Sequence, residues 1–147
     1  EVYLPAAGAP APPAERASDP LQRQGRVLVM DDDPIIRRVS GLLLRKLGFT
    51  VEGAADGAQA VELYRQARDR GEPFDAVILD LTVVAGMGGD ACLQELRARD
   101  PDVRAIVASG FHNDPVMAEF RRHGFRAVVA KPYTLEQLVR AIDEARA

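Results

Sequence analysis

The chain has 147 residues, and its content of 47% hydrophobic and 28% charged residues is that of a single globular domain with a full core. A net charge of -3 argues against a surface devoted mainly to nucleic acid, and no apolar run is long enough to cross a bilayer. We therefore expect neither nucleic acid nor membrane as a partner of this segment. The single cysteine, Cys92, lies on a helical apolar stripe, which predicts a small buried residue and a reducing, cytoplasmic setting.

Residues 1–25 differ in composition from the rest of the chain. They contain five prolines among alanines, without a regular repeat: Pro5, Pro10, Pro12, Pro13 and Pro20. This composition is typical of an extended linker that has no core of its own. We predict a linker over residues 1–25 and a folded domain over residues 26–147.

Residues 26–147 alternate between short apolar runs and segments in which apolar residues have helical spacing. The apolar runs predict strands over residues 26–30, 49–54, 74–79, 103–108 and 127–130. The helical segments predict five helices, which begin near Pro34, Asp56, Asp90, Pro115 and Leu135. This alternation is typical of a parallel sheet that is covered on both faces. We predict a flavodoxin-like, doubly wound α/β fold with five strands in the order 2-1-3-4-5 and five helices.

The first predicted helix has a clear start and a predicted inner face. Asp33 is expected as its N-cap residue, with Pro34 in the first turn. The basic pair Arg37-Arg38 is predicted to lie in solvent. The apolar residues at helical spacing, which we expect to face the core, are Ile36, Val39, Leu43 and Leu47.

Polar residues follow four of the five predicted strands. Asp31 and Asp32 come after the first strand, Asp80 after the third, Ser109 after the fourth and Lys131 after the fifth. Because the carboxyl ends of parallel strands share one edge of the sheet, we expect these side chains to meet there. Any one of them alone has an ordinary explanation: Asp31 and Asp32 solvated beside a helix cap, Ser109 in a turn, and Lys131 in solvent.

These residue types together favour one kind of chemistry. Two carboxylates ~4 Å apart repel each other by on the order of 4 kcal/mol at an effective dielectric near 20, so buried acidic groups require a cation among them. Carboxylates suit Mg²⁺, and a lysine with a hydroxyl offers donors to an anion. A metal ion, a lysine and a hydroxyl together form a binding site for a phosphoryl group. One carboxylate is then the nucleophile that forms an aspartyl phosphate.

With these residues in place, the sequence resembles the receiver domains of two-component response regulators. The resemblance covers residues 26–146, and its four motifs occur in the same order at the same strand ends. The motifs are Met30-Asp31-Asp32-Asp33, Leu79-Asp80-Leu81, Ala108-Ser109-Gly110 and Val129-Ala130-Lys131-Pro132-Tyr133.

The resemblance implies a metal site and a phosphoacceptor. By this resemblance, Asp80 accepts the phosphoryl group. Asp32 binds Mg²⁺ directly, Asp31 binds it through water, and Thr82 contributes its backbone carbonyl. Asp80 itself completes the set of metal ligands.

The resemblance also implies how the phosphoryl group is held and where it comes from. Ser109 and Lys131 bind its oxygens, and the donor is a phosphohistidine on a kinase or a phosphotransfer protein. Many receivers have a proline four residues after the acceptor and an aromatic residue three before the lysine. Here these positions are Val84 and Val128. Because Val128 is not aromatic, the sequence does not predict the family's coupling between the strand-end hydroxyl, here Ser109, and an aromatic residue.

Two further stretches resemble parts of hybrid histidine kinases. Residues 81–89 and 109–117 resemble the corresponding stretches of receiver domains that are fused to the C-terminus of such kinases. Residues 1–5 are similar to the last strand of a kinase ATP-binding domain. We expect the chain to be the tail of a hybrid kinase. The receiver would then be a phosphoacceptor switch, with the kinase activity, and any membrane anchor, in the parent protein.

Two other functions are compatible with parts of the pattern. A Mg²⁺-dependent phosphatase of the haloacid dehalogenase type also uses an aspartate nucleophile, but it requires a second acidic residue two positions later. Thr82 occupies that position after Asp80, which counts against the phosphatase. A degenerate receiver kept only for docking is the third possibility, and the complete set of polar residues argues against it.

Overall fold

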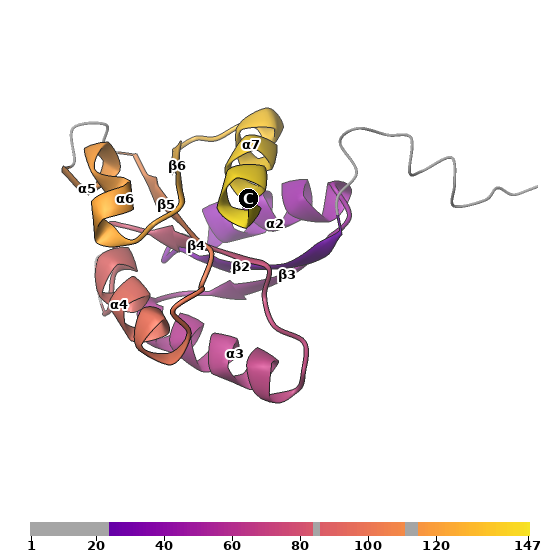
Figure 1. Cartoon of the computed structure of the whole chain (residues 1–147). Helices are drawn as coiled ribbons and strands as arrows, with labels where there is room; N and C mark the ends of the chain where they lie inside the picture. The colour runs from indigo at the N-terminus through magenta and orange to yellow at the C-terminus, as the bar shows by residue number, and fades with distance from the viewer. Residues whose placement is uncertain (1–23, 84–85, 111–114) are drawn as a thin grey trace, which may run out of the picture.

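The computed structural model describes residues 24–83, 86–110 and 115–147 (Figure 1). Nearly all of the predicted linker, including the stretch compared with a kinase domain, lies outside these residues, and so does Val84. The described residues make up almost all of the domain that the sequence predicts from residue 26 onward.

Five parallel strands form one sheet in the order β3-β2-β4-β5-β6, which confirms the predicted order 2-1-3-4-5. Every residue of two neighbouring strands, β4 and β5, is buried, as their unbroken apolar sequences predict. Strand β3 lies at one edge and is more polar. The strands are β2 (Gly25–Met30), β3 (Phe49–Ala54), β4 (Ala76–Asp80), β5 (Ala105–Ser109) and β6 (Ala127–Ala130).

Six helices occur in the described residues, one more than the sequence predicts. They are α2 (Pro34–Lys46), α3 (Gly57–Asp69), α4 (Gly89–Arg99), α5 (Pro115–Ala118), α6 (Phe120–His123) and α7 (Leu135–Arg146). The predicted fourth helix is divided because Glu119 has non-helical backbone angles, φ -118 and ψ 38. Neither half buries a residue fully, so little packing energy holds this segment in one continuous helix. None of the described helices has the length and hydrophobicity needed to cross a membrane.

The helices cover both faces of the sheet (Figure 1). Helices α2 and α7 pack on one face, and α3 and α4 pack on the other. The alternation of side chains along β2 separates the two cores: Val27 and Val29 face α2 and α7, whereas Leu28 and Met30 face α3 and α4. Because both faces are covered, the edge formed by the strands' carboxyl ends is where polar side chains can gather.

The predicted start of α2 is confirmed, but its predicted inner face is partly wrong. Asp33 is the N-cap residue, and its side chain accepts a hydrogen bond from the backbone N–H of Ile35. Val39, which the apolar spacing places inside, is 49% exposed. The buried positions of the helix are instead Ser40, Gly41 and Leu44. The helix is therefore rotated so that a serine faces the sheet and a valine faces solvent.

Cys92 is fully buried in α4, as the sequence predicts, and its Sγ donates to the carbonyl oxygen of Gly57 at 3.6 Å. Burial raises the pKa of the thiol to about 12. We expect the native protein to react very slowly with a thiol reagent such as DTNB at about pH 8, because the reactive thiolate is both scarce and inaccessible. The unfolded protein in guanidinium should release one equivalent at once. Rapid reaction of the native protein would contradict the buried position.

Candidate functional site

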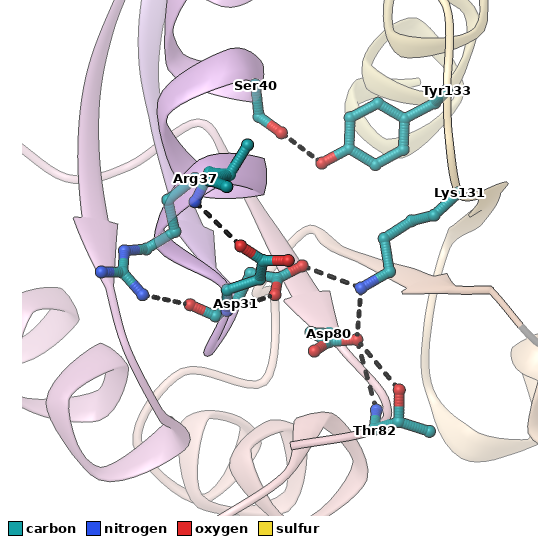
Figure 2. Close-up of polar contacts among 9 residues, drawn as sticks. Asp31, Arg37, Ser40, Asp80, Thr82, Lys131 and Tyr133 are labelled. Carbon is teal, nitrogen blue, oxygen red and sulfur yellow. Dashed lines mark hydrogen bonds and ion pairs between the residues drawn. The ribbon is translucent and has the colours of Figure 1, made fainter. Parts of the chain in front are cut away.

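The site lies where the carboxyl ends of four strands meet (Figure 2). Asp31 and Asp32 follow the last residue of β2, and Asp80 is the last residue of β4. Ser109 ends β5, and Lys131 follows β6. The apolar strands carry these residues to one edge because their hydrophobic side chains fill the two cores beneath it.

Lys131 joins two carboxylates that come from different strands. Its Nζ lies 2.9 Å from Oδ2 of Asp31 and 3.0 Å from Oδ1 of Asp80 (Figure 2). The exposed fractions of Asp31 and Asp80 are only 2% and 1%. Charges buried this deeply are tolerated only where an opposite charge lies among them. The lysine therefore supplies the countercharge that the two aspartates need.

A third carboxylate completes an acidic cluster. Ligand oxygens of Asp31, Asp32 and Asp80 all lie within 4.8 Å of one another. One lysine against three carboxylates leaves these four side chains with an excess of negative charge. Oδ2 of Asp80 is buried and accepts no hydrogen bond from the residues that the structure describes. A buried, unpartnered carboxylate oxygen inside a cluster of hard oxygen donors fits a divalent cation such as Mg²⁺.

The two oxygens of Asp80 have different surroundings. Oδ1 accepts from Lys131 Nζ, from the backbone N–H of Thr82 at 3.3 Å and from the Thr82 hydroxyl at 3.5 Å (Figure 2). Oδ2 has none of these contacts. The side chain is thus held by one oxygen, while the other remains available to an incoming group.

The ionisation of this ion pair follows from its burial and its contacts. Burial raises the pKa of Asp80 above its ordinary value, and the hydrogen bond from Lys131 acts in the opposite direction without cancelling it. For Lys131, burial alone would lower the pKa, but the bonds to Asp31 and Asp80 outweigh it, so the pKa is raised. The lysine therefore stays charged, and a cation beside Asp80 would favour its carboxylate form.

Ser109 and Thr82 lie at the same edge of the sheet, and the chemical roles of all the predicted site residues stay predictions. Ser109 is buried at the end of β5, next to the strand that carries Asp80. The backbone pairing continues past the end of β4, where the N–H of Leu81 donates to the carbonyl of Ala108 at 2.9 Å. Phosphoryl binding by Ser109 and metal binding by the backbone carbonyl of Thr82 stay predictions.

Arg37 belongs to the surroundings of the site, which the sequence does not predict. The sequence places the pair Arg37-Arg38 in solvent, and Arg38 is exposed, but Arg37 is half-buried. Its Nη1 donates to the backbone carbonyl of Asp31 at 2.6 Å (Figure 2). The backbone N–H of Asp33 donates to Oδ1 of Asp31 at 2.9 Å. The first turn of α2 and its cap residue therefore hold the acidic loop, which is the segment of residues 31–33 between β2 and α2.

A hydrogen-bonded pair of hydroxyls near the site is also absent from the sequence-based predictions. Ser40 on α2 is fully buried, and its hydroxyl is hydrogen-bonded to the Tyr133 hydroxyl (Figure 2). The signal in the sequence is that Ser40 falls four residues after Ile36 and four before Leu44, on the stripe that faces the core. A polar residue on such a stripe indicates a buried hydrogen-bond partner.

Gly89, the first residue of α4, lies against the backbone of the residue that the sequence predicts as phosphoacceptor. A Cβ at this position would be 2.7 Å from the carbonyl oxygen of Asp80. We expect Gly89→Ala to destabilise the fold by about 1–3 kcal/mol, because the backbone around Asp80 must move to relieve the overlap. Chemical unfolding measures this change.

Gly110→Ala is the matched control for this substitution, because a Cβ there meets nothing within 4 Å. We expect it to change the free energy of unfolding by less than about 0.5 kcal/mol. If Gly89→Ala were as stable as Gly110→Ala, the close approach to Asp80 would be contradicted.

Comparisons with known proteins agree with this architecture. The chain is 31% identical over 130 residues to the sensor kinase CckA of Brucella abortus, a match that covers 88% of this chain and 13% of the kinase. It is 29% identical over 120 residues to the chemotaxis protein CheY of Thermotoga maritima, which covers 81% of this chain and 95% of that protein. The chain thus spans nearly all of CheY but only a small part of the kinase.

A solved structure of the same fold is the receiver domain of a sensor histidine kinase from Pseudomonas aeruginosa PAO1, which holds a magnesium ion in its active site cleft. It superposes with a TM-score of 0.72 at 24% identity, and the match covers 85% of this chain and 100% of that domain. The family described as response regulator receiver domain matches residues 27–143. The chain therefore belongs to the response regulator receiver domains of two-component signalling.

Proposed function

We propose that this receiver takes a phosphoryl group from a phosphohistidine onto Asp80. The observation that carries the proposal is the asymmetry of Asp80: Lys131 and Thr82 hold Oδ1, while Oδ2 is buried in the acidic cluster without a hydrogen-bond partner among the described residues. Asp31, Asp32, Asp80 and the backbone carbonyl of Thr82 would hold Mg²⁺. Bound there, the ion would neutralise charge on the phosphoryl oxygens.

The chain's own residues perform the rest of the transfer. A carboxylate oxygen of Asp80 attacks phosphorus, the new O–P bond forms, and the P–N bond breaks with its electron pair going to the imidazole nitrogen. Lys131 keeps its charge and holds the carboxylate in place, then pairs with the phosphoryl oxygens. Ser109 donates its hydroxyl to the same oxygens. The phosphoryl group adds nearly two negative charges to this edge of the sheet.

The surface beside the site suits a helical partner. Ile35, Val39 and Leu42 of α2 are 70%, 49% and 57% exposed, and their spacing of four and three residues makes one apolar stripe. The stripe borders a groove of about 450 Å³ that runs to Lys131 and is lined mainly by Ile35, Ile36, Val39, Pro132 and Tyr133. We propose that a helix of the phosphohistidine-bearing partner packs here, because the groove leads to Lys131, which contacts the proposed phosphoacceptor Asp80.

We also propose that the chain is the receiver segment of a hybrid histidine kinase that acts in the cytoplasm. The likeness to the sensor kinase CckA and to the Pseudomonas kinase receiver supports this context. In that arrangement the partner that carries the phosphohistidine is a kinase or a phosphotransfer domain of the same pathway.

The first test replaces the phosphoacceptor. With acetyl phosphate and Mg²⁺, we expect the wild type to gain one phosphoryl group by mass spectrometry and Asp80→Asn to gain none, because the amide is not a nucleophile. EDTA should abolish the reaction of the wild type. Asp33→Asn is the matched control, since asparagine keeps the helix cap at a neighbouring exposed position. Modification of Asp80→Asn at the wild-type rate would show that another residue is the acceptor.

The second test concerns the partner surface. We expect Leu42→Glu to slow transfer from a phosphorylated histidine phosphotransfer domain by about tenfold or more, because the charge must be desolvated in the contact. Phosphorylation by acetyl phosphate, which needs no docking, should be unchanged. Ala58→Glu, on the exposed side of α3 across the sheet, is the control. Equal transfer rates for Leu42→Glu and Ala58→Glu would exclude the stripe as the docking surface.

A further inference from the structure

The hydroxyls of Ser40 and Tyr133 form a partly buried hydrogen bond between α2 and the segment that carries Lys131 (Figure 2). Ser40 has no exposed surface, and Tyr133 is half-buried. These hydroxyls bond to each other, whereas Lys131 forms the ion pairs with the buried aspartates. The hydroxyl pair makes no contact in the ion pair, so the phosphoryl chemistry proposed at Asp80 does not explain why these two hydroxyls are present.

Tyr133 is well placed to fix the backbone position of Lys131, which lies two residues earlier. The N–H of Lys131 donates to the carbonyl of Ser109 at 2.9 Å, which continues the pairing of β6 with β5. After it comes Pro132, which is exposed and has no N–H to donate. Tyr133 attaches the chain to α2 at this point, before α7 begins at its cap residue Thr134.

The same helix also holds the other side of the Lys131 ion pair. Arg37, one turn before Ser40, donates to the backbone carbonyl of Asp31 at 2.6 Å. Helix α2 thus contacts the acidic loop through Arg37 and the lysine segment through Ser40. Both ends of the contact between Lys131 and Asp31, at 2.9 Å, are positioned relative to one rigid element.

We propose that the Ser40–Tyr133 hydroxyl pair positions Lys131 for phosphoryl transfer to Asp80. Ser40 and Tyr133 are positioning residues, because they act through Lys131 and not on the phosphoryl group itself. The inference rests on the proposed function. A small displacement of the ammonium group weakens its contact with the phosphoryl oxygens, and errors of about 1 Å can slow a reaction about a hundredfold.

The energetics of a hydrogen-bonded hydroxyl pair separate positioning from stability. Removing one hydroxyl leaves the other without its partner in a partly buried place, which destabilises a protein, whereas removing both can be nearly neutral. If the pair served stability alone, the double variant Ser40→Ala/Tyr133→Phe would regain wild-type behaviour. If the pair positions Lys131, the double variant regains stability but reacts as slowly as the single variants.

The experiment measures three quantities on the full chain: the phosphorylation rate at saturating acetyl phosphate, the Mg²⁺ concentration for half-maximal rate, and the thermal unfolding midpoint. We expect Tyr133→Phe, Ser40→Ala and the double variant to react about tenfold more slowly. The Mg²⁺ requirement should not change, because every proposed metal ligand is retained. The unfolding midpoint should fall in the single variants and recover in the double variant.

Tyr64→Phe is the matched control, because it also removes a hydrogen-bonded tyrosine hydroxyl: Tyr64 is buried on the other face of the sheet and donates to Asp100 at 2.7 Å. We expect it to lower the unfolding midpoint without slowing phosphorylation. A double variant that reacts at the wild-type rate would overturn the positioning role, and so would equal slowing by Tyr64→Phe. If the wild type is not modified at all, the proposed function fails together with this inference.

Discussion

The ion pairs of Lys131 with Asp31 and Asp80 are the contacts on which the rest of the site depends. Two nearly inaccessible aspartates would repel each other and lose their hydration without compensation. The lysine reaches both, at 2.9 and 3.0 Å, from the end of a strand at the far side of the sheet. The site is therefore complete only when the sheet has assembled as far as β6, and the stability of the acidic edge is inseparable from the order of the strands.

Much of this arrangement follows from the sequence because parallel strands impose it. An apolar run that is buried on both faces must expose its first polar residue at the edge of the sheet, so Asp31, Asp80 and Lys131 are predictable neighbours once the strand order is known. The helix cap at Asp33 is equally predictable, since it depends on a local hydrogen bond between its side chain and the backbone of the first turn. Both kinds of prediction rely on rules that need only a few neighbouring residues.

Other features depend on how side chains from distant segments fit together. The spacing of apolar residues in α2 predicts that Val39 faces the core. In the structure the helix is turned so that Ser40 faces inward and bonds to Tyr133, and Val39 faces solvent. The prediction of a solvated Arg37 is wrong for a similar reason. Its hydrogen-bond acceptor is a backbone carbonyl, and no sequence pattern reveals which carbonyl an arginine side chain will reach. The division of the fourth helix at Glu119 likewise reflects weak packing of a short segment rather than a local breaker such as proline or glycine.

The position of Lys131 along the chain has a consequence for synthesis. The aspartates belong to strands that leave the ribosome well before the lysine, which lies 100 residues after Asp31 and 51 after Asp80. A nascent chain that has folded its first three strands exposes an acidic edge without its ammonium group. Until β6 joins the sheet, Asp31 and Asp80 have no lysine between them, so the last strand to be made is also the one that compensates the charge carried by the first and the third.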